Sequence, residues 1–282
     1  MPIYLLNGLV YGGLLYILSV GLVLIFGLRR VVNFAHGGLF MLSSYIAYAT
    51  ALHAGFWVAL LVAVVALSLL GVVLDRLVFQ RLQKEDPIVT MLVTFGVLLV
   101  LEDLVRTVWG RDYLTVPPPA LLDSVVPIGG TSFPVYRLAV IVVAIAVVSS
   151  LSLWLRFSRI GLYVRACSTD PVTTGMQGVD TERLSALVVA IGTGLAGLSG
   201  AIAAPLLALS PAMGGNVVID CFVVVVTGGL GSFTGAFIAA ILIGQVGTLG
   251  VIYLPDLASM IPLLVMVMVL LWRPGGLVRS GA

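Results

Sequence analysis

The dominant feature of this sequence is a series of long apolar runs that carry almost no charge. The first extends from Ile3 to Leu28. Seven further runs share this character, near residues 36–52, 56–79, 88–109, 136–156, 184–209, 234–254 and 258–272. A helix needs about 20 apolar residues to cross a bilayer, whereas a barrel would show alternating strands of about ten residues. The runs predict an all-α fold, a polytopic transmembrane helical bundle with about eight spanning helices.

The composition agrees with a membrane protein. Hydrophobic residues make up 61% of the 282 residues and charged residues only 9%, whereas a soluble domain carries about 25% charged residues. Too little polar surface remains to cover a water-facing globule. The formal net charge of +2 says little by itself. We expect contact with membrane lipid, no nucleic-acid partner, and a single transmembrane domain over residues 1–282.

Some segments depart from simple spanning helices. The first run lacks a basic start and a small-residue cleavage site and is long for a signal peptide, so we expect a retained span. The run 217–227 is too short to cross alone and is expected to form a half helix or re-entrant segment. Polar connections fall at 80–87, 110–135 and 157–183. The proline-rich part of the second, 117–134, predicts an ordered or extended loop outside the membrane.

The distribution of lysine and arginine predicts the orientation. With the N-terminus outside and every full run crossing, eleven of the fourteen basic residues lie inside. They are Arg29, Arg30, Arg76, Arg81, Lys84, Arg156, Arg159, Arg165, Arg183, Arg273 and Arg279. The outer side keeps Arg106, Arg111 and Arg137. Because cytosolic loops are enriched in these residues, we expect an external N-terminus, a cytosolic C-terminus and a cytosolic 157–183 loop.

Small residues spaced four apart occur in two of the runs. They are Gly8 and Gly12 in the first run, and Gly192, Ala196 and Gly200 in the run 184–209. Such rows let helix backbones approach closely in lipid. We therefore expect a compact bundle centred on these two helices.

The motifs of common enzymes are missing. The chain has no G-x-x-x-x-G-K-[ST] phosphate loop, no H-E-x-x-H and no G-x-S-x-G. Its two histidines, His36 and His53, are too far apart to form a helical metal pair, and Cys167 and Cys221 are expected to be free thiols. We expect no catalytic residue, no metal and no cofactor.

The loop 157–183 contains strong helix-boundary signals. Asp170 can accept from the open amides of a first turn, and Pro171 at the first helical position loses no hydrogen bond. Gly178 can end that helix in the left-handed conformation. These residues predict a short helix over 171–177, and Asp180 or Thr181 predicts the start of the next helix. The segment is either an ordinary connection or a docking element for a cytosolic partner.

The stretch VVNFAHGGLF, residues 31–40, predicts a helix break at the inner end of the first run. Asn33 can cap the following helix by accepting from an amide near His36. Gly37 and Gly38 can allow close approach of another helix. His36 either points into a pathway or bonds to a neighbouring carbonyl.

The stretch TGGLGS, residues 227–232, has three glycines in five residues, which rules out a regular helix. It is either a tight packing turn or a re-entrant tip that lines a pathway. Asp220 lies in an apolar segment and is either functional or near enough to the outer end of its half helix to reach water. Glu102 and Asp103 are spaced to pair with Arg106 on one helix.

Together, NFAHG at 33–37, RAC at 165–167 with Asp170 and Gly178, GGLGS at 228–232 and RPGGLV at 273–278 resemble the permease of branched-chain amino acid ABC importers, the LivH type. The order and spacing match over nearly the whole chain. The sequence also resembles relatives that import urea, short amides or aromatic acids. Two departures are Gly38, where many relatives carry an acid, and Thr169, where many carry glutamate.

The resemblance implies a permease in a bacterial cytoplasmic membrane that works with a second homologous permease, two cytosolic ATPases that bind the ATP, and an external solute-binding protein. It implies an ATPase-coupling segment over 166–178, with these candidate residues: Ala166, Cys167, Asp170, Pro171, Thr174 and Gly178. With the residues singled out above, it suggests the following pathway or hinge positions: Asn33, Phe34, His36, Gly37, Asp220, Gly228, Gly229 and Gly231.

Two other classes of function stay open at this level. A self-sufficient secondary transporter or channel would need an ion site, for which Asp220 is the one candidate. An intramembrane enzyme would need a nucleophile or an acid pair, and neither is evident. Because the chain offers few buried polar groups, we expect the binding protein to supply most of the solute specificity, and a small neutral or zwitterionic solute fits best.

Overall fold

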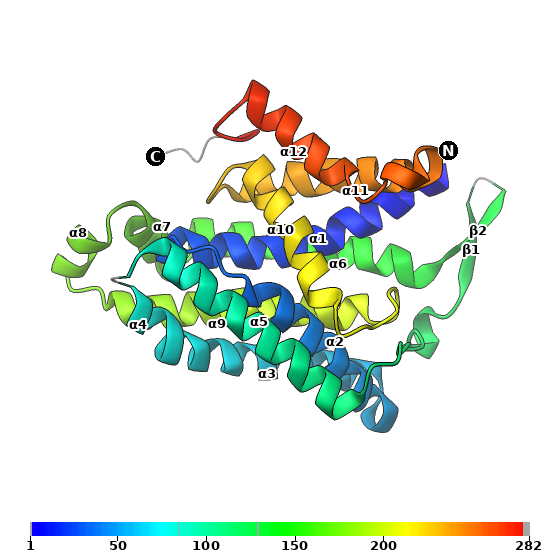
Figure 1. The fold of residues 1–282 in the computed structure, drawn as a ribbon, viewed down its shortest axis with the longest axis horizontal. Coiled ribbons are helices and arrows are strands. Elements are labelled where there is room, and N and C mark those ends of the chain that lie inside the picture. The colour runs from blue at the N-terminus through cyan, green and yellow to red at the C-terminus, as the bar shows by residue number, and fades with distance from the viewer. Residues whose placement is uncertain (1, 84, 129, 279–282) are drawn as a thin grey trace.

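The computed structural model describes residues 2–83, 85–128 and 130–278. Over these residues the chain is a bundle of helices, as expected (Figure 1). The long helices are α1 (Pro2–Arg29), α2 (Ala35–Ala54), α3 (Phe56–Leu74), α5 (Pro87–Trp109), α6 (Val135–Phe157), α9 (Thr181–Ala203), α10 (Met213–Gly228), α11 (Phe233–Tyr253) and α12 (Ile261–Trp272). The short helices are α4 (Gln80–Leu82), α7 (Arg159–Thr169) and α8 (Pro171–Met176).

Six helices in the described part of the chain are long and apolar enough to cross a membrane. They are α1, the continuous unit from α3 to α4, α5, α6, α9 and α11. The helix α2 is long enough, but its serine, tyrosine and histidine side chains make it less apolar. The helices α10 and α12 are shorter than a full span. The fold is that of a polytopic helical membrane protein.

The centre of the bundle is formed by α1 and α9, as the rows of small residues predict. In α1, 83% of the most apolar 18-residue window is buried inside the chain, and in α9 67%, whereas α3, α5 and α6 each bury 22%. A Cβ atom at Gly192 would lie 2.7 Å from the Gly21 carbonyl oxygen, and one at Gly12 would lie 2.8 Å from the Ala240 carbonyl oxygen. The backbones of α9 and α11 therefore pack directly against the backbone of α1. The outer helices leave an apolar face exposed to lipid.

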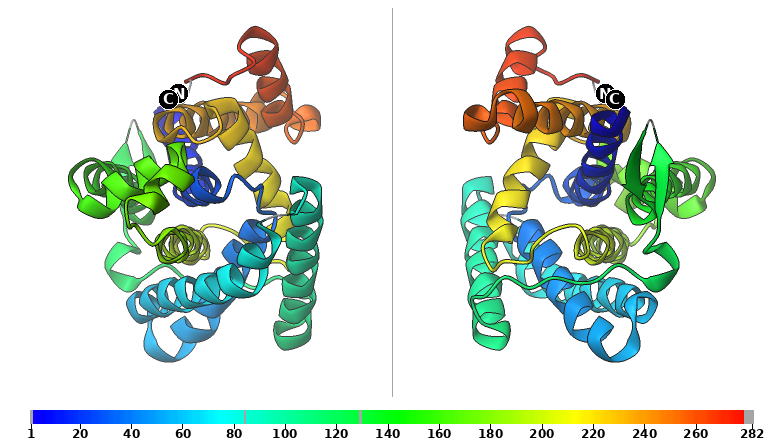
Figure 2. Two further views of the ribbon diagram at one scale, coloured as in Figure 1. Left: turned by 90° about the vertical axis from the view of Figure 1, so that its left-hand side faces the viewer. Right: turned by 90° about the vertical axis from the view of Figure 1, so that its right-hand side faces the viewer.

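The helix α10 lies differently from its neighbours. Viewed along the long axis, α9 appears end-on while α10 appears from the side, so α10 crosses the bundle (Figure 2). It packs against α2, α1, α11 and α12 along its course. This short helix thus connects opposite sides of the bundle near its middle.

Some expected helix limits were wrong. Residues 204–209 are not helical, because α9 ends at Ala203 just before Pro205, which has no amide to continue the ladder. The half helix expected over 217–227 begins earlier, at Met213. The last helix begins at Ile261 rather than 258, after a 3-10 turn, η3 (Pro255–Leu257). The helix over the run 56–79 continues to Leu82, through a π-helical turn, η1 (Asp75–Phe79).

The proline-rich connection contains the two strands of an otherwise helical fold in the described residues. After a 3-10 turn, η2 (Ala120–Leu122), two short strands, β1 (Val125–Ile128) and β2 (Thr131–Pro134), pair in antiparallel fashion. Phe133 is buried and anchors this hairpin on the bundle. An ordered or extended loop was expected here, and its strands were not anticipated.

The two ends of the bundle differ in charge. At one end lie α4, α7 and α8, and at the other lie the hairpin and the start of α1 (Figure 1). The basic residues assigned to the inner side in the described chain lie on or next to elements of the first end. Toward the second end, Arg106 lies in the last turn of α5, Arg111 just after α5, and Arg137 in the first turn of α6. Lys84 and Arg279 lie outside the described residues.

Candidate functional site

The short helix predicted in the loop 157–183 is present as α8. Asp170 caps it: one carboxylate oxygen accepts from the amides of Val172 at 3.0 Å and Thr173 at 3.1 Å. The Thr173 hydroxyl donates to the other oxygen at 2.5 Å. The Thr173 hydroxyl bond and the amide bonds stabilise the charged form and lower the pKa of Asp170. Gly178, with φ of 85°, ends the turn as expected.

The helix that precedes α8 was missed. Residues 159–169 form α7, and the Ser158 hydroxyl caps it by accepting from the Gly161 amide at 2.8 Å. Gly161, Val164 and Cys167 repeat at three-residue spacing and are all buried. Serine followed by this apolar spacing is a helix-start signal that the sequence already contains.

The candidate coupling residues divide into two groups. Cys167 and Thr174 are buried, with 5% and 6% of their surface exposed, and position the two helices. Ala166, Asp170, Pro171 and Gly178 are exposed. Burial raises the pKa of the Cys167 thiol, while the nearby Arg29 charge acts in the opposite direction. Both cysteines are free, as expected, and Cys167 is a poorly reactive thiol.

The break between α1 and α2 is built around Asn33, which is fully buried. Its side-chain oxygen accepts from the Ala35 amide at 3.0 Å, and its backbone oxygen accepts from the His36 amide at 3.3 Å. The side-chain bond goes to Ala35 rather than to an amide near His36, and Phe34, which makes no side-chain capping bond, stands at the N-cap position of α2. The Phe34 amide donates to the Thr94 hydroxyl at 3.2 Å, and the Phe34 ring lies 4.9 Å from that of Phe222.

His36 is also fully buried and bonds to a neighbouring carbonyl, one of the two expected arrangements. Its Nε2 lies 3.0 Å from the Leu18 carbonyl oxygen of α1. Leu18 precedes the end of α1 at Arg29 by eleven residues, or about 16 Å at a rise of about 1.5 Å per residue. The first turn of α2 therefore lies deep in the bundle. The break begins at the end of α1, where it was expected. The chain then returns into the bundle before α2 begins.

The glycines after His36 allow the close approach that was predicted. A Cβ atom at Gly37 would collide with the Gly214 carbonyl oxygen and lie 2.6 Å from Val218. One at Gly38 would lie 3.0 Å from the side chains of Leu98 and Leu101. The start of α2 is thus in contact with α1, α5 and α10.

The glycine-rich stretch 227–232 forms a turn between α10 and α11. Gly229 and Gly231 have φ of 105° and 83°, values that suit glycine. Ser232 caps α11 by accepting from the Gly235 amide at 3.0 Å. The C-terminal segment covers the turn, because the amide of Leu277 donates to the Thr227 carbonyl oxygen at 2.8 Å. This geometry favours a packing turn.

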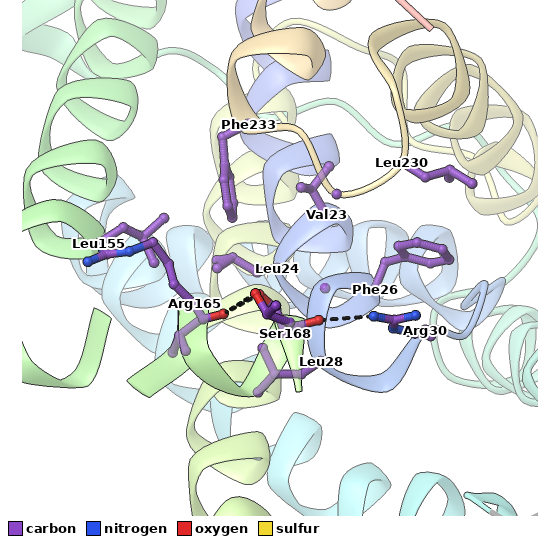
Figure 3. A pocket seen from close by; sticks show the side chains of 14 residues that line it. Val23, Leu24, Phe26, Leu28, Arg30, Leu155, Arg165, Ser168, Leu230 and Phe233 are labelled. Carbon is purple, nitrogen blue, oxygen red and sulfur yellow. Dashed lines mark hydrogen bonds between the residues drawn. The ribbon is translucent and has the colours of Figure 1, made fainter. Parts of the chain in front are cut away.

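A cavity of about 440 Å³ lies where α7, the end of α1 and this turn meet (Figure 3). Leu230 and Gly231 of the turn line it from one side, and Ser168 and Thr169 of α7 from another. Arg30 reaches across from the end of α1 and donates to the Ser168 carbonyl oxygen at 3.1 Å. The loop and the glycine turn, two regions chosen separately from the sequence, therefore adjoin one cavity, together with the end of α1 that precedes the break.

Asp220 is not at the outer end of its helix. It is the eighth of 16 residues in α10, because the helix begins at Met213. The Tyr11 hydroxyl donates to its carboxylate at 2.6 Å, and Asp220 is half-buried. The expected pair of Glu102 and Arg106 is present at 3.5 Å.

The sequence of this chain matches a known family over most of its length. Residues 4–270 match the family described as "Branched-chain amino acid transport system / permease component". The chain is 27% identical to the high-affinity branched-chain amino acid transport system permease protein BraD of Pseudomonas aeruginosa, over 97% of this chain and 94% of that protein. It is 25% identical to LivH of Escherichia coli K12, over 96% and 93%. A probable LivH of Methanocaldococcus jannaschii is also 25% identical, over 96% and 90%.

No solved structure matches the chain. Because the family profile covers nearly the whole chain and the relatives align from end to end, the resemblance seen in the motifs is confirmed. Members of this family are permease subunits without catalytic activity of their own. The chain belongs to the LivH and BraD family, the permease components of branched-chain amino acid ABC transport systems.

Proposed function

We propose that this chain carries a branched-chain amino acid, or a related small polar solute, across the membrane by alternating access driven by two partner ATPases. The observation that carries the proposal is α8. It is a separate helix with its own cap, and it protrudes at the arginine-rich end of the bundle (Figure 1). Its apolar side chains Val172 and Met176 are 65% and 82% exposed. A short helix that exposes apolar side chains suits insertion into a groove of a partner.

The charge difference between the two ends supports the orientation proposed for the chain. The end with α7 and α8 carries the arginines that the positive-inside rule assigns to the cytosol. The N-terminus is then external, the C-terminus cytosolic, and the hairpin faces outward. The domain would span residues 1–282 in a bacterial cytoplasmic membrane, with α2 and α12 completing about eight crossings and α10 as the half helix.

Family membership supports the proposed assembly. A second homologous permease would complete the membrane part, an external solute-binding protein would deliver solute to the hairpin end, and the ATPases would bind ATP and α8. The chain itself needs no cofactor. Ala166, Cys167, Asp170, Pro171, Thr174 and Gly178 would form the coupling segment, with the buried members holding α7 and α8 together.

The break at Asn33, Phe34, His36 and Gly37 is proposed as the hinge of the pathway. The backbone of residues 30–34 is not helical and lets α2 tilt relative to α1, while His36 and Gly37 lie in the first turn of α2, which touches α10. The helix α10 carries Asp220 in its middle and ends at Gly228, where Gly229 and Gly231 turn the chain into α11. A tilt of α2 would therefore move α10. Because α10 crosses the bundle, its movement would shift the helices on the other side.

Crosslinking from α8 tests the coupling assignment. Cys167 is a poor probe because it is buried, so a cysteine is introduced by Met176→Cys and carries a thiol-specific photocrosslinker. The control is Tyr113→Cys, which is 76% exposed and follows α5 toward the opposite end. In the assembled importer, ATPase subunits are expected to crosslink to position 176 and not to 113. An assembled complex without crosslinks at 176, or with equal crosslinks at 113, would contradict the assignment.

A further inference from the structure

The residue that follows α1 has an unusual backbone. Arg30 has φ of 51° and is the one non-glycine residue with positive φ among the residues described. Side chains are disfavoured in this left-handed region, and glycine is the usual residue there. The Arg30 amide donates to the Phe26 carbonyl oxygen at 2.8 Å, which closes α1 before the chain turns back into the bundle. An arginine at this position indicates that its side chain has a role.

The side chain of Arg30 joins α1 to the last turn of α7. Its guanidinium donates to the Ser168 carbonyl oxygen at 3.1 Å (Figure 3). The last carbonyls of a helix have no partner within the helix, and a positive charge is favourable at this end. The bond therefore satisfies an open acceptor with a charged donor.

The bond lies a few residues from two elements that the proposed function requires to move together. Ser168 precedes Asp170, the cap of α8, by two residues, and Arg30 precedes Asn33, whose side chain accepts from the first amide of α2, by three. No helix intervenes between Arg30 and the start of α2. Only a few residues on each side of the bond would therefore be needed to transmit a displacement of α8 to the hinge.

Of the two neighbouring arginines, Arg29 is held in place by its surroundings, whereas Arg30 has free space beside it. Arg29, the neighbouring residue, is fixed to the buried Asp75 through a pair at 2.7 Å. Arg30 instead borders the 440 Å³ cavity, so it has room to move without repacking a dense core. The end of α1 can thus act as a fixed point about which Arg30 and the segment after it shift.

We propose that Arg30 is a positioning residue that transmits the movement of α8 to the hinge at Asn33, through its bond to the Ser168 carbonyl. This inference rests on the proposed ATP-driven transport. It assigns to one guanidinium the link between ATP hydrolysis and the tilt of α2.

The test uses the complete importer in proteoliposomes, with ATP hydrolysis and solute uptake measured together. Arg30→Gly removes the guanidinium and suits the positive φ, so thermal stability and basal ATPase activity are expected to stay near those of the unmodified chain. The solute moved per ATP is expected to fall about tenfold, a size usual for coupling between sites. Arg30→Lys keeps a charged donor and is expected to retain most of the coupling. Arg159→Ala, which removes a charge at the same end, is the control.

An unchanged ratio of solute to ATP in Arg30→Gly would overturn the inference, as would a loss explained by lower thermal stability. An Arg30→Lys variant as defective as Arg30→Gly, or an equal defect in Arg159→Ala, would also contradict it. These outcomes differ from a failure of the proposed function, in which the unmodified importer itself would show no ATP-dependent uptake.

Discussion

Replacing Asp75 by alanine is expected to destabilise the protein by about 3–5 kcal/mol. Asp75 is fully buried, and one of its oxygens accepts from the Arg29 guanidinium at 2.7 and 3.1 Å. The other oxygen accepts from the Gln80 side chain at 3.0 Å. The Arg29 side chain is only 4% exposed, so removal of the carboxylate leaves a buried charge without its counter-ion, with only the neutral Gln83 side chain as acceptor. Thermal unfolding of the purified chain in detergent measures the loss.

Two comparisons separate this effect from a general loss of charge. Arg183→Ala removes an exposed pair with Asp180 and is expected to cost about 0–1 kcal/mol. Replacing both buried partners, as Arg29→Met with Asp75→Leu, is expected to recover most of the stability, because neither charge is then left alone. Equal losses for Asp75→Ala and Arg183→Ala would show that the buried pair is not important for stability.

The second large effect is expected at Gly37, where alanine should destabilise the protein by about 1–3 kcal/mol or more. The added methyl group would meet the Gly214 carbonyl oxygen and the Val218 side chain. Since a backbone oxygen cannot rotate away, α2 and α10 would have to separate. Thermal unfolding measures the stability, and reconstituted uptake is expected to fall with it because the two helices meet at the proposed hinge.

Gly96 provides the matched control in α5. Nothing lies within 4 Å of a Cβ atom built there, and alanine is favoured over glycine inside a helix by about 1 kcal/mol. Gly96→Ala is therefore expected to be neutral or stabilising. A Gly37→Ala variant as stable as Gly96→Ala would mean that α2 and α10 do not pack as closely as described.

Local sequence signals predicted a large part of this structure. The apolar runs identified the helices, and Asp170, Gly178 and Asp180 set the limits of α8 and the start of α9, since caps act on amides only two or three residues away. The positive φ values of Gly229 and Gly231 also follow from residue type.

Features that depend on contacts between distant segments were not predicted. The depth of the break at Asn33 depends on the left-handed Arg30, and arginine carries no signal for that conformation. Asp75 lies in an apolar run and gains its partner from α1, 46 residues away. The strands β1 and β2 and the course of α10 likewise depend on pairing and packing that no short stretch encodes.

Solute uptake into proteoliposomes tests the central claim most directly. The chain is reconstituted alone and with its second permease, the two ATPases and the solute-binding protein. Uptake of a branched-chain amino acid is expected only in the complete assembly and only with ATP on the side of the ATPases. Uptake by the chain alone, driven by the solute gradient or by an ion gradient, would contradict the claim and favour a self-sufficient transporter or channel.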